Sequence, residues 1–227
     1  MRMNSLVVMV GIKDANNNVQ LLGTGFALPK KGYFVTCRHV LGDRTDHIVL
    51  VLADRYDSDG YQDASKHKCR MIDVKAVDSV NPLCDLIILK TDSVTLDIPS
   101  LGDLDAIQVG DEVDIVGFPH CVNDWQMHIL TVQRTRVGAK VLRESQTIKY
   151  KYAILNVQTR PGQSGSLVYS PRLQKVIGIL VGGYSISSGI SLGGINPFEL
   201  NQTSFCLSAQ YITLIPQHFD LTLFIST

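Results

Sequence analysis

The chain has 227 residues, of which 21 are basic and 21 acidic, so its formal net charge is zero. A neutral chain lacks the positive field that favours binding to nucleic acid or to an anionic membrane, and neither is expected as a partner. Hydrophobic residues make up 45% of the sequence, as in ordinary packed proteins, but the longest apolar runs are far too short to span a bilayer. The length allows one domain or two small ones.

The predicted elements are many short β-strands separated by turn residues. Six lie before residue 100, at Leu6–Gly11, Gln20–Leu28, Tyr33–Cys37, His47–Leu52, Cys69–Val77 and Leu86–Lys90. Six lie after it, at Glu112–Gly117, Gln126–Gln133, Tyr150–Val157, Ser166–Tyr169, Val176–Val181 and Ser204–Leu207, and a short helix is predicted at Ala209–Ile215. Two sets of six strands predict an all-β fold of two closed barrels, with residues 1–100 in the first and 101–227 in the second.

The five cysteines favour a reducing environment. They are Cys37, Cys69, Cys84, Cys121 and Cys206, an odd number without a Cys-x-x-Cys pair. This argues against a disulfide framework and against a zinc site, and no metal or other cofactor is predicted. Met1–Met3 carries one charge and is not followed by an apolar run of signal-peptide length, so we expect an intracellular, cytoplasmic protein.

Three motifs follow one another along the chain. The strand containing Gly23–Phe26 is followed by an apolar strand that ends at His39, and Asp85 opens the apolar run Leu86–Leu89. Further on, Pro161–Gly165 holds a serine between glycines after a Pro-Gly turn. Small neighbours let a substrate carbonyl approach the backbone closely, and such a turn can aim two N–H groups at one point.

A serine hydroxyl is a poor nucleophile until a base takes its proton and a third group orients that base. His39, Asp85 and Ser164 are the candidates with the right settings. The other histidines, His47, His67, His120, His128 and His218, are expected to be surface or structural residues. Asp43, Asp46, Asp73 and Asp78 compete with Asp85, and Ser166 competes with Ser164 but lacks a following glycine.

Together these motifs resemble the chymotrypsin-like serine peptidases, and within them the HtrA/Deg-type trypsin-like domains. The resemblance runs from about residue 5 to residue 215 and includes Val116–Pro119. It implies two six-stranded antiparallel Greek-key barrels, with His39 as base, Asp85 as its orienting partner and Ser164 as nucleophile. The N–H groups of Gly162 and Ser164 are the expected oxyanion hole. The implied activity is hydrolysis of peptide bonds in proteins or peptides through an acyl-enzyme.

Several residues depart from the family pattern. Gln163 stands where many trypsins have an aspartate that pairs with a newly cleaved N-terminus, so activation by such cleavage is not expected. Ser166 replaces a second glycine. The expected substrate pocket has Gln158 at its base, six positions before the serine, and Val181, Gly182 and Gly183 as its wall. No acidic residue occupies the pocket base, so a preference for Arg or Lys is not expected.

The stretch Gly182–Gly194 is rich in glycine and serine. It is either a surface loop or a loop that shapes the cleft and is ordered by the substrate or by a regulatory protein partner. Two alternatives to a cellular peptidase remain open at this point. One is a catalytically silent trypsin-like module that binds peptides, and the other is a viral polyprotein peptidase of the same fold.

Overall fold

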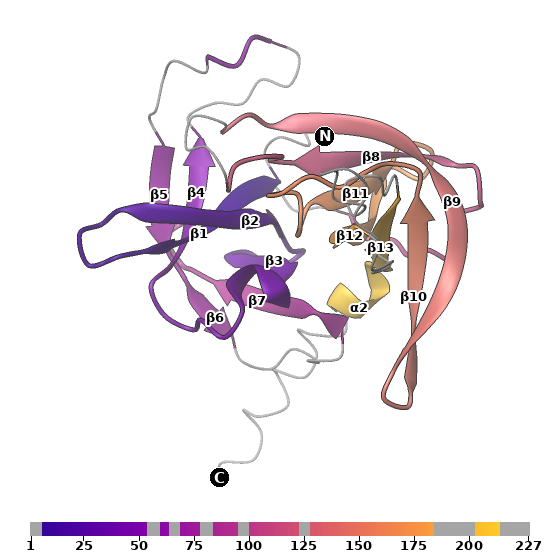
Figure 1. The fold of residues 1–227 in the computed structure, drawn as a ribbon, viewed down its shortest axis with the longest axis horizontal. Coiled ribbons are helices and arrows are strands. Elements are labelled where there is room, and N and C mark those ends of the chain that lie inside the picture. The colour runs from indigo at the N-terminus through magenta and orange to yellow at the C-terminus, as the bar shows by residue number, and fades with distance from the viewer. Residues whose placement is uncertain are drawn as a thin grey trace, which may run out of the picture.

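The fold is that of a computed structural model, which describes residues 6–53, 60–63, 69–77, 84–94, 100–122, 128–183 and 203–213. Strands dominate, and the described part of the chain forms two antiparallel sheets that pack against each other (Figure 1). The all-β, chymotrypsin-like fold class is therefore confirmed. None of the described helices is long and apolar enough to cross a membrane.

The first sheet contains seven strands in the order β5-β4-β1-β2-β3-β7-β6 and is open among the described residues, whereas a closed barrel was expected here. Its strands are β1 (Val7–Lys13), β2 (Val19–Ala27), β3 (Tyr33–Cys37), β4 (Ile48–Ala53), β5 (Cys69–Asp73), β6 (Lys75–Val77) and β7 (Leu86–Lys90). One more strand is present than expected because the predicted strand Cys69–Val77 is broken at Val74, whose N–H donates to the carbonyl of Ile48. The break lets β5 pair with β4 while β6 pairs with β7.

The second sheet is a closed barrel in the order β10-β13-β12-β11-β8-β9. Its strands are β8 (Glu112–Gly117), β9 (Thr131–Ser145), β10 (Ile148–Leu155), β11 (Leu167–Ser170), β12 (Lys175–Gly183) and β13 (Ser204–Ser208). Closure pairs the strands around the ring, so the barrel presents no open edge. The short helix α2 (Gln210–Thr213) follows β13, as predicted.

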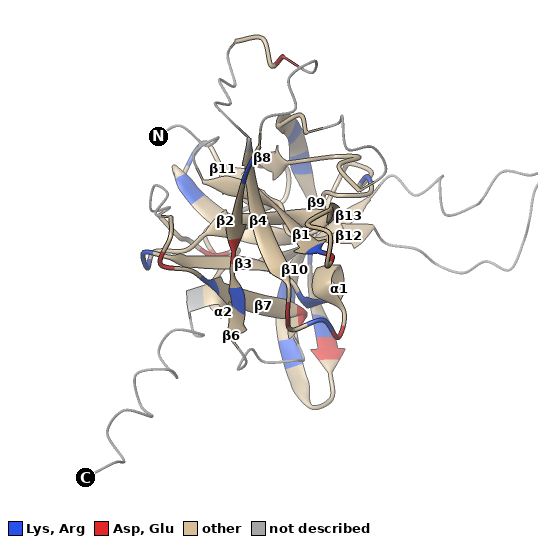
Figure 2. Ribbon diagram, turned by 90° about the vertical axis from the view of Figure 1, so that its left-hand side faces the viewer, with Lys and Arg blue, Asp and Glu red and all other residues tan. Residues whose placement is uncertain are grey.

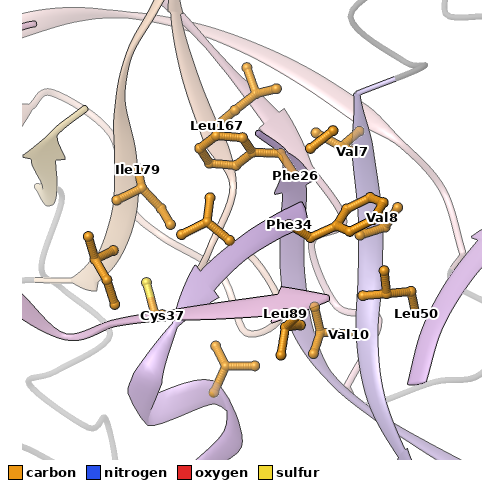
Figure 3. Close-up of a cluster of buried hydrophobic side chains, with 14 of the residues drawn as sticks. Val7, Val8, Val10, Phe26, Phe34, Cys37, Leu50, Leu89, Leu167 and Ile179 are labelled. Carbon is orange, nitrogen blue, oxygen red and sulfur yellow. The ribbon is translucent and has the colours of Figure 1, made fainter. Parts of the chain in front are cut away.

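One hydrophobic cluster joins the two sheets. Phe26 and Phe34 of the first sheet are fully buried, and Leu167 and Ile179 of the barrel belong to the same cluster. Figure 3 shows these side chains together with Cys37, the last residue of β3, which belongs to the same cluster. A second cluster fills the barrel interior around Val113, Ile115, Val168 and Ile177. Because the core continues between the sheets, segments at their junction are held from both sides.

Charged residues of both signs are interspersed over the elements in Figure 2, as the zero net charge leads one to expect. Several form ion pairs, such as Lys13 with Asp73 at 2.6 Å and Arg172 with Asp111 at 2.7 Å.

Candidate active site

The pairing of β3 with β7 brings His39 and Asp85 together. Cys37 lies opposite Leu86 in this antiparallel ladder, so the residues just beyond them are also neighbours. The N–H of Arg38 donates to the Asp85 carbonyl at 2.9 Å, which extends the ladder by one bond. The chain then turns into the one-turn helix α1 (Arg38–Leu41), which carries His39.

Both carboxylate oxygens of Asp85 contact His39. Oδ1 accepts a hydrogen bond from the His39 backbone N–H at 2.9 Å, and Oδ2 lies 2.6 Å from the ring Nδ1. Asp85 takes the left-handed backbone conformation, with φ +53°. An ionised carboxylate only accepts hydrogen bonds, so Nδ1 carries the ring proton and Nε2 is left as the basic nitrogen.

Ser164 lies in a tight turn that contacts both sheets. Gly162 and Gly165 on either side of it have φ +92° and φ +87°, which is the region that favours glycine. The Ser164 carbonyl accepts from the Thr24 N–H of β2 at 2.9 Å, and the Gly165 N–H donates to the Leu180 carbonyl of β12 at 2.8 Å. The nucleophile candidate is thus attached to the first sheet and to the barrel at once.

The structure brings Ser164 and His39 to the same junction but does not join them by a hydrogen bond within the described residues. The Leu180 carbonyl is shared, since it accepts from the Cys37 thiol at 3.4 Å as well as from Gly165. Cys37 is two residues before His39. The Ser164 hydroxyl donates instead to the Val181 carbonyl at 3.2 Å.

The amides expected to form the oxyanion hole are those of Gly162 and Ser164. Neither N–H has a hydrogen-bond acceptor among the residues that the structure describes, although Gly162 is buried. The Pro161 carbonyl accepts from His120 N–H at 2.5 Å, and the Gln163 carbonyl accepts from Ser166 N–H at 2.9 Å. In a trans peptide the C=O and N–H point in opposite directions. The bond to the Pro161 carbonyl therefore fixes the direction of the Gly162 N–H, and the bond to the Gln163 carbonyl fixes that of the Ser164 N–H.

Comparison with known families bears directly on these residues. The family model of the trypsin-like peptidase domain matches residues 23–179, well over half of the chain and a span that includes His39, Asp85 and Ser164. The chain belongs to the trypsin-like peptidase domain family.

Relatives and solved structures of trypsin-like domains agree with this assignment. A probable periplasmic serine endoprotease, DegP-like, from Pseudomonas putida (strain GB-1) is 27% identical over 73% of this chain and 30% of its own length. The HtrA-type protease AlgW with a decapeptide superposes with TM-score 0.68 at 21% identity, over 96% of this chain and 66% of that one. The MamO protease domain from Magnetospirillum magneticum (apo form) gives TM-score 0.65 at 16% identity, over 93% and 96%. The resemblance to HtrA/Deg-type domains is thereby confirmed, and the chain spans about a third of that curated relative.

The expected intracellular location is wrong by the same comparison, because the curated DegP-like relatives are named as periplasmic proteins. The names point to a periplasmic or secreted trypsin-like domain. None of the five cysteines, all of which the structure describes, forms a disulfide, and all except Cys69 are buried. Burial raises the pKa of the Cys121 thiol to about 12 and raises that of Cys37 well above its ordinary value. Buried, protonated thiols are inert in an oxidising compartment too, so an odd cysteine count could not decide the location.

Gln163 forms part of the turn framework of this trypsin-like domain. Its side chain is buried, with Oε1 accepting from Arg160 N–H at 2.8 Å and Nε2 donating to Gln133 Oε1 at 3.2 Å. Its own N–H donates to the Arg160 carbonyl at 3.0 Å. The position that many trypsins give to a carboxylate is therefore filled by a neutral residue whose hydrogen bonds are made within the domain.

Of the four expected pocket residues, Val181 contacts the serine through a hydrogen bond. Val181 and Gly182 are half-buried and Gly183 is exposed at the end of β12, while Gln158 is half-buried after β10. Val181 is brought next to the nucleophile candidate, because its carbonyl accepts the Ser164 hydroxyl. Of the Gly182–Gly194 loop, residues 184–194 lie outside the described residues.

One candidate group of metal ligands is present among the described residues. It consists of Cys37, His39 and Asp85, whose possible ligand atoms lie within 4.8 Å of one another. The arrangement does not suit one. Nδ1 of His39 and Oδ2 of Asp85 are 2.6 Å apart, which is a hydrogen-bond distance. Burial, and after it the Asp85 charge, hold the pKa of the Cys37 thiol well above its ordinary value, whereas a thiol must lose its proton to bind a metal.

Two residues important to this site escaped the reading of the sequence. The motif Gly23–Phe26 contains Thr24 but indicates no role for it, yet its hydroxyl donates to the Gly162 carbonyl at 2.8 Å. Thr36, which precedes the histidine motif, donates to the Thr24 carbonyl at 2.6 Å. A hydroxyl residue between two glycines of an apolar strand was the one signal for Thr24 in the sequence, because a polar group that becomes buried there needs a partner.

Ser166 gives a prediction about stability. Its side chain is fully buried, and its hydroxyl has no hydrogen-bond partner among the described residues. We expect Ser166→Ala to be neutral or to raise the free energy of unfolding by about 1 kcal/mol, because a buried hydroxyl without a partner costs desolvation. Urea denaturation measures this. Gly117→Ala is the opposite control, since a Cβ there would overlap the Ser166 side chain and should destabilise the fold. A large loss of stability in Ser166→Ala would contradict the interpretation.

Proposed function

We propose that this chain is a serine endopeptidase in which Ser164 is the nucleophile, His39 the general base and Asp85 the residue that orients the base. The observation that carries the proposal is the double contact of Asp85 with His39, through the backbone N–H at 2.9 Å and the ring Nδ1 at 2.6 Å. It holds the ring in one orientation and one tautomer. That is the task of the acidic member of a Ser-His-Asp triad.

Acylation begins when the Ser164 hydroxyl leaves the Val181 carbonyl and turns towards Nε2 of His39. Rotation about χ1 between staggered rotamers is enough to redirect a serine hydroxyl. The oxygen then bonds to the carbonyl carbon of the scissile peptide while its proton passes to Nε2. Asp85 stabilises the imidazolium that forms, and His39 gives the proton to the leaving amine as the C–N bond breaks. Water repeats the sequence on the acyl-enzyme and releases the acid.

The N–H groups of Gly162 and Ser164 are the proposed oxyanion hole. Their lack of an acceptor within the described residues supports this role, because a buried N–H is otherwise almost always paired. Donors fixed in advance cost no reorganisation when the carbonyl oxygen becomes negative. Removal of one such donor in a serine peptidase costs about 100- to 1000-fold in turnover.

The proposed division of the chain places His39 and Asp85 in a first domain, residues 1–100, and Ser164 in a second, residues 101–227. Strands up to Lys90 pair within the first sheet, and strands from Glu112 pair within the barrel. Leu101 forms a bridge with Val176 of the barrel, which supports placing it in the second domain. The substrate would then bind across the junction, as ligands often do between domains.

The proposed substrates are proteins or peptides with an uncharged residue before the scissile bond. Gln158 at the pocket base and the Val181–Gly183 wall are neutral, so a basic side chain would gain no ion pair there. We also propose that substrate or a regulatory protein partner orders Gly182–Gly194 and completes the cleft. The glycine and serine content of this stretch supports this, because ordering it costs backbone entropy.

The test is digestion of a peptide library, with cleavage sites identified by mass spectrometry. We expect internal cleavage after uncharged residues, with no enrichment for Arg or Lys at that position. Strong selection for Arg or Lys would contradict the pocket assignment. Peptides that bind but remain uncleaved would favour the catalytically silent module, whereas the bacterial relatives give no support to a viral polyprotein peptidase.

A further inference from the structure

Thr24 of β2 reaches from the first sheet into the turn that carries Ser164. It is fully buried, and its hydroxyl donates to the Gly162 carbonyl at 2.8 Å. The same oxygen accepts from the Phe118 N–H at 3.1 Å. The hydroxyl therefore has both a donor role and an acceptor role filled, in an interior where loss of either contact leaves a buried polar group unpaired.

The Thr24 backbone makes two more contacts that fix the position of its side chain. Its N–H donates to the Ser164 carbonyl at 2.9 Å, and its carbonyl accepts from the Thr36 hydroxyl at 2.6 Å. One residue of the first sheet thus holds the carbonyls of both Gly162 and Ser164. These carbonyls flank Gln163 in the turn.

Each carbonyl shares a peptide plane with the N–H of the next residue. The Pro161 and Gln163 carbonyls therefore set the directions of the Gly162 and Ser164 N–H groups, and the Gly162 carbonyl belongs to the peptide that joins these two. Four successive carbonyls, those of Pro161, Gly162, Gln163 and Ser164, each accept a hydrogen bond. Three of the donors are backbone N–H groups, and the donor to Gly162 is the Thr24 side chain. That bond is therefore the one of the four that a substitution removes without altering the main chain.

The backbone of Gly162 is intrinsically free to rotate, so a hydrogen bond to its carbonyl restricts the turn at this residue. With φ +92° and no Cβ, it can take up many backbone conformations, so its peptide groups can rotate more readily than those of other residues. A Cβ at this position would lie 2.6 Å from the Phe118 carbonyl oxygen, so a residue with a more restricted backbone cannot take the place of this glycine.

We propose that Thr24 is a positioning residue of the oxyanion hole: its hydroxyl holds the Gly162–Gln163 peptide, which joins the two peptides that carry the Gly162 and Ser164 N–H groups, and so keeps both N–H groups directed at the reacting carbonyl oxygen. This inference rests on the proposed peptidase function for its kinetic consequence, but the orientation of the amides is a property of the protein itself. It makes the first sheet a contributor to transition-state binding through a residue that does not touch the substrate.

The experiment compares Thr24→Val, which keeps the shape and removes the hydroxyl, with Thr24→Ser, which keeps the hydroxyl. Thr91→Val is the matched control, because Thr91 is also buried and its hydroxyl accepts the Ser93 N–H at 3.1 Å in a turn at the far end of β7. Thr24→Ala replaces Thr24→Val if the valine variant does not fold. Each variant is compared in kcat, in KM and in inhibition by a peptidyl aldehyde. The aldehyde carbon bonds to Ser164 Oγ and places an oxyanion in the hole.

We expect Thr24→Val to lower kcat about 10- to 100-fold with KM changed less than about 3-fold, and to weaken aldehyde inhibition by a similar factor. Thr24→Ser should stay within about 3-fold of the unmodified chain, as should Thr91→Val. A folded Thr24→Val or Thr24→Ala variant with unchanged kcat would overturn the proposal. So would a loss in Thr24→Ser equal to that in Thr24→Val, which would assign the effect to the methyl group.

A second readout does not require activity. In ¹H–¹⁵N NMR spectra we expect Thr24→Val to shift and broaden the Gly162 and Ser164 amide signals, and Thr91→Val to leave them unchanged. If the unmodified chain hydrolyses no peptide, the proposed function fails while these signals still decide the positioning role. If Thr24→Val leaves both amides unchanged, the positioning role fails while the function stands.

Discussion

Ser164→Ala is expected to abolish peptide cleavage while the protein stays folded. The hydroxyl makes one described hydrogen bond, to the Val181 carbonyl, and the backbone contacts of the turn do not involve it. Its removal should therefore leave the thermal midpoint almost unchanged, whereas turnover falls by about six orders of magnitude for loss of a serine nucleophile. Peptide cleavage and circular dichroism together measure both effects.

Ser166→Ala is the matched control for this experiment. Ser166 is two residues away and fully buried, so it cannot receive a substrate carbonyl, and the variant should keep its cleavage rate. Unchanged cleavage by Ser164→Ala would refute the assignment of the nucleophile. Loss of cleavage in both variants would point instead to disruption of the turn.

His39→Ala and Asp85→Asn should each reduce turnover by several orders of magnitude. Asp85→Asn is the more informative, because the amide keeps the shape but can donate to Nδ1, which stabilises the wrong tautomer and removes the basic Nε2. In the reference triad this change costs about 10⁴-fold. Asp73→Asn is the control, since Asp73 forms an ion pair with Lys13 in the same sheet and away from the proposed site.

The three residues should also behave as one unit. Combining His39→Ala or Asp85→Asn with Ser164→Ala should cost no more than Ser164→Ala alone, because a base has no function without its nucleophile. Steady-state kinetics on the single and double variants measure the coupling. Effects that multiply independently would mean that His39 and Asp85 do not act through Ser164.

The sequence located the elements of the proposed site because short-range signals specify them. Tyr33–Cys37 and Leu86–Lys90 are apolar runs with clear ends, and both are strands with these bounds. Their antiparallel pairing then forces the neighbours His39 and Asp85 together. The Pro-Gly turn before Ser164 was visible for a similar reason, since the left-handed backbone at Gly162 and Gly165 favours glycine.

Other features depend on distant partners and could not be predicted in this way. The strand expected at Gln126–Gln133 is β9, which begins at Thr131 and continues to Ser145. Charged residues such as Arg134 and Arg136 obscured its alternation, yet Arg134 is paired with the buried Asp114, which lies opposite it on β8. The sequence also could not show that the Ser164 hydroxyl bonds to Val181, because rotamers depend on surroundings that only the fold assembles.

The most direct test of the account is covalent labelling with a fluorophosphonate, followed by identification of the labelled peptide by mass spectrometry. The phosphorus bonds to an activated serine oxygen as fluoride leaves, so the probe reports the nucleophile without knowledge of the substrate. We predict one label, on Ser164, with labelling lost in Ser164→Ala and strongly slowed in His39→Ala. A folded chain that takes up no label, or carries it on another residue, would contradict the assignment of Ser164 as an activated nucleophile.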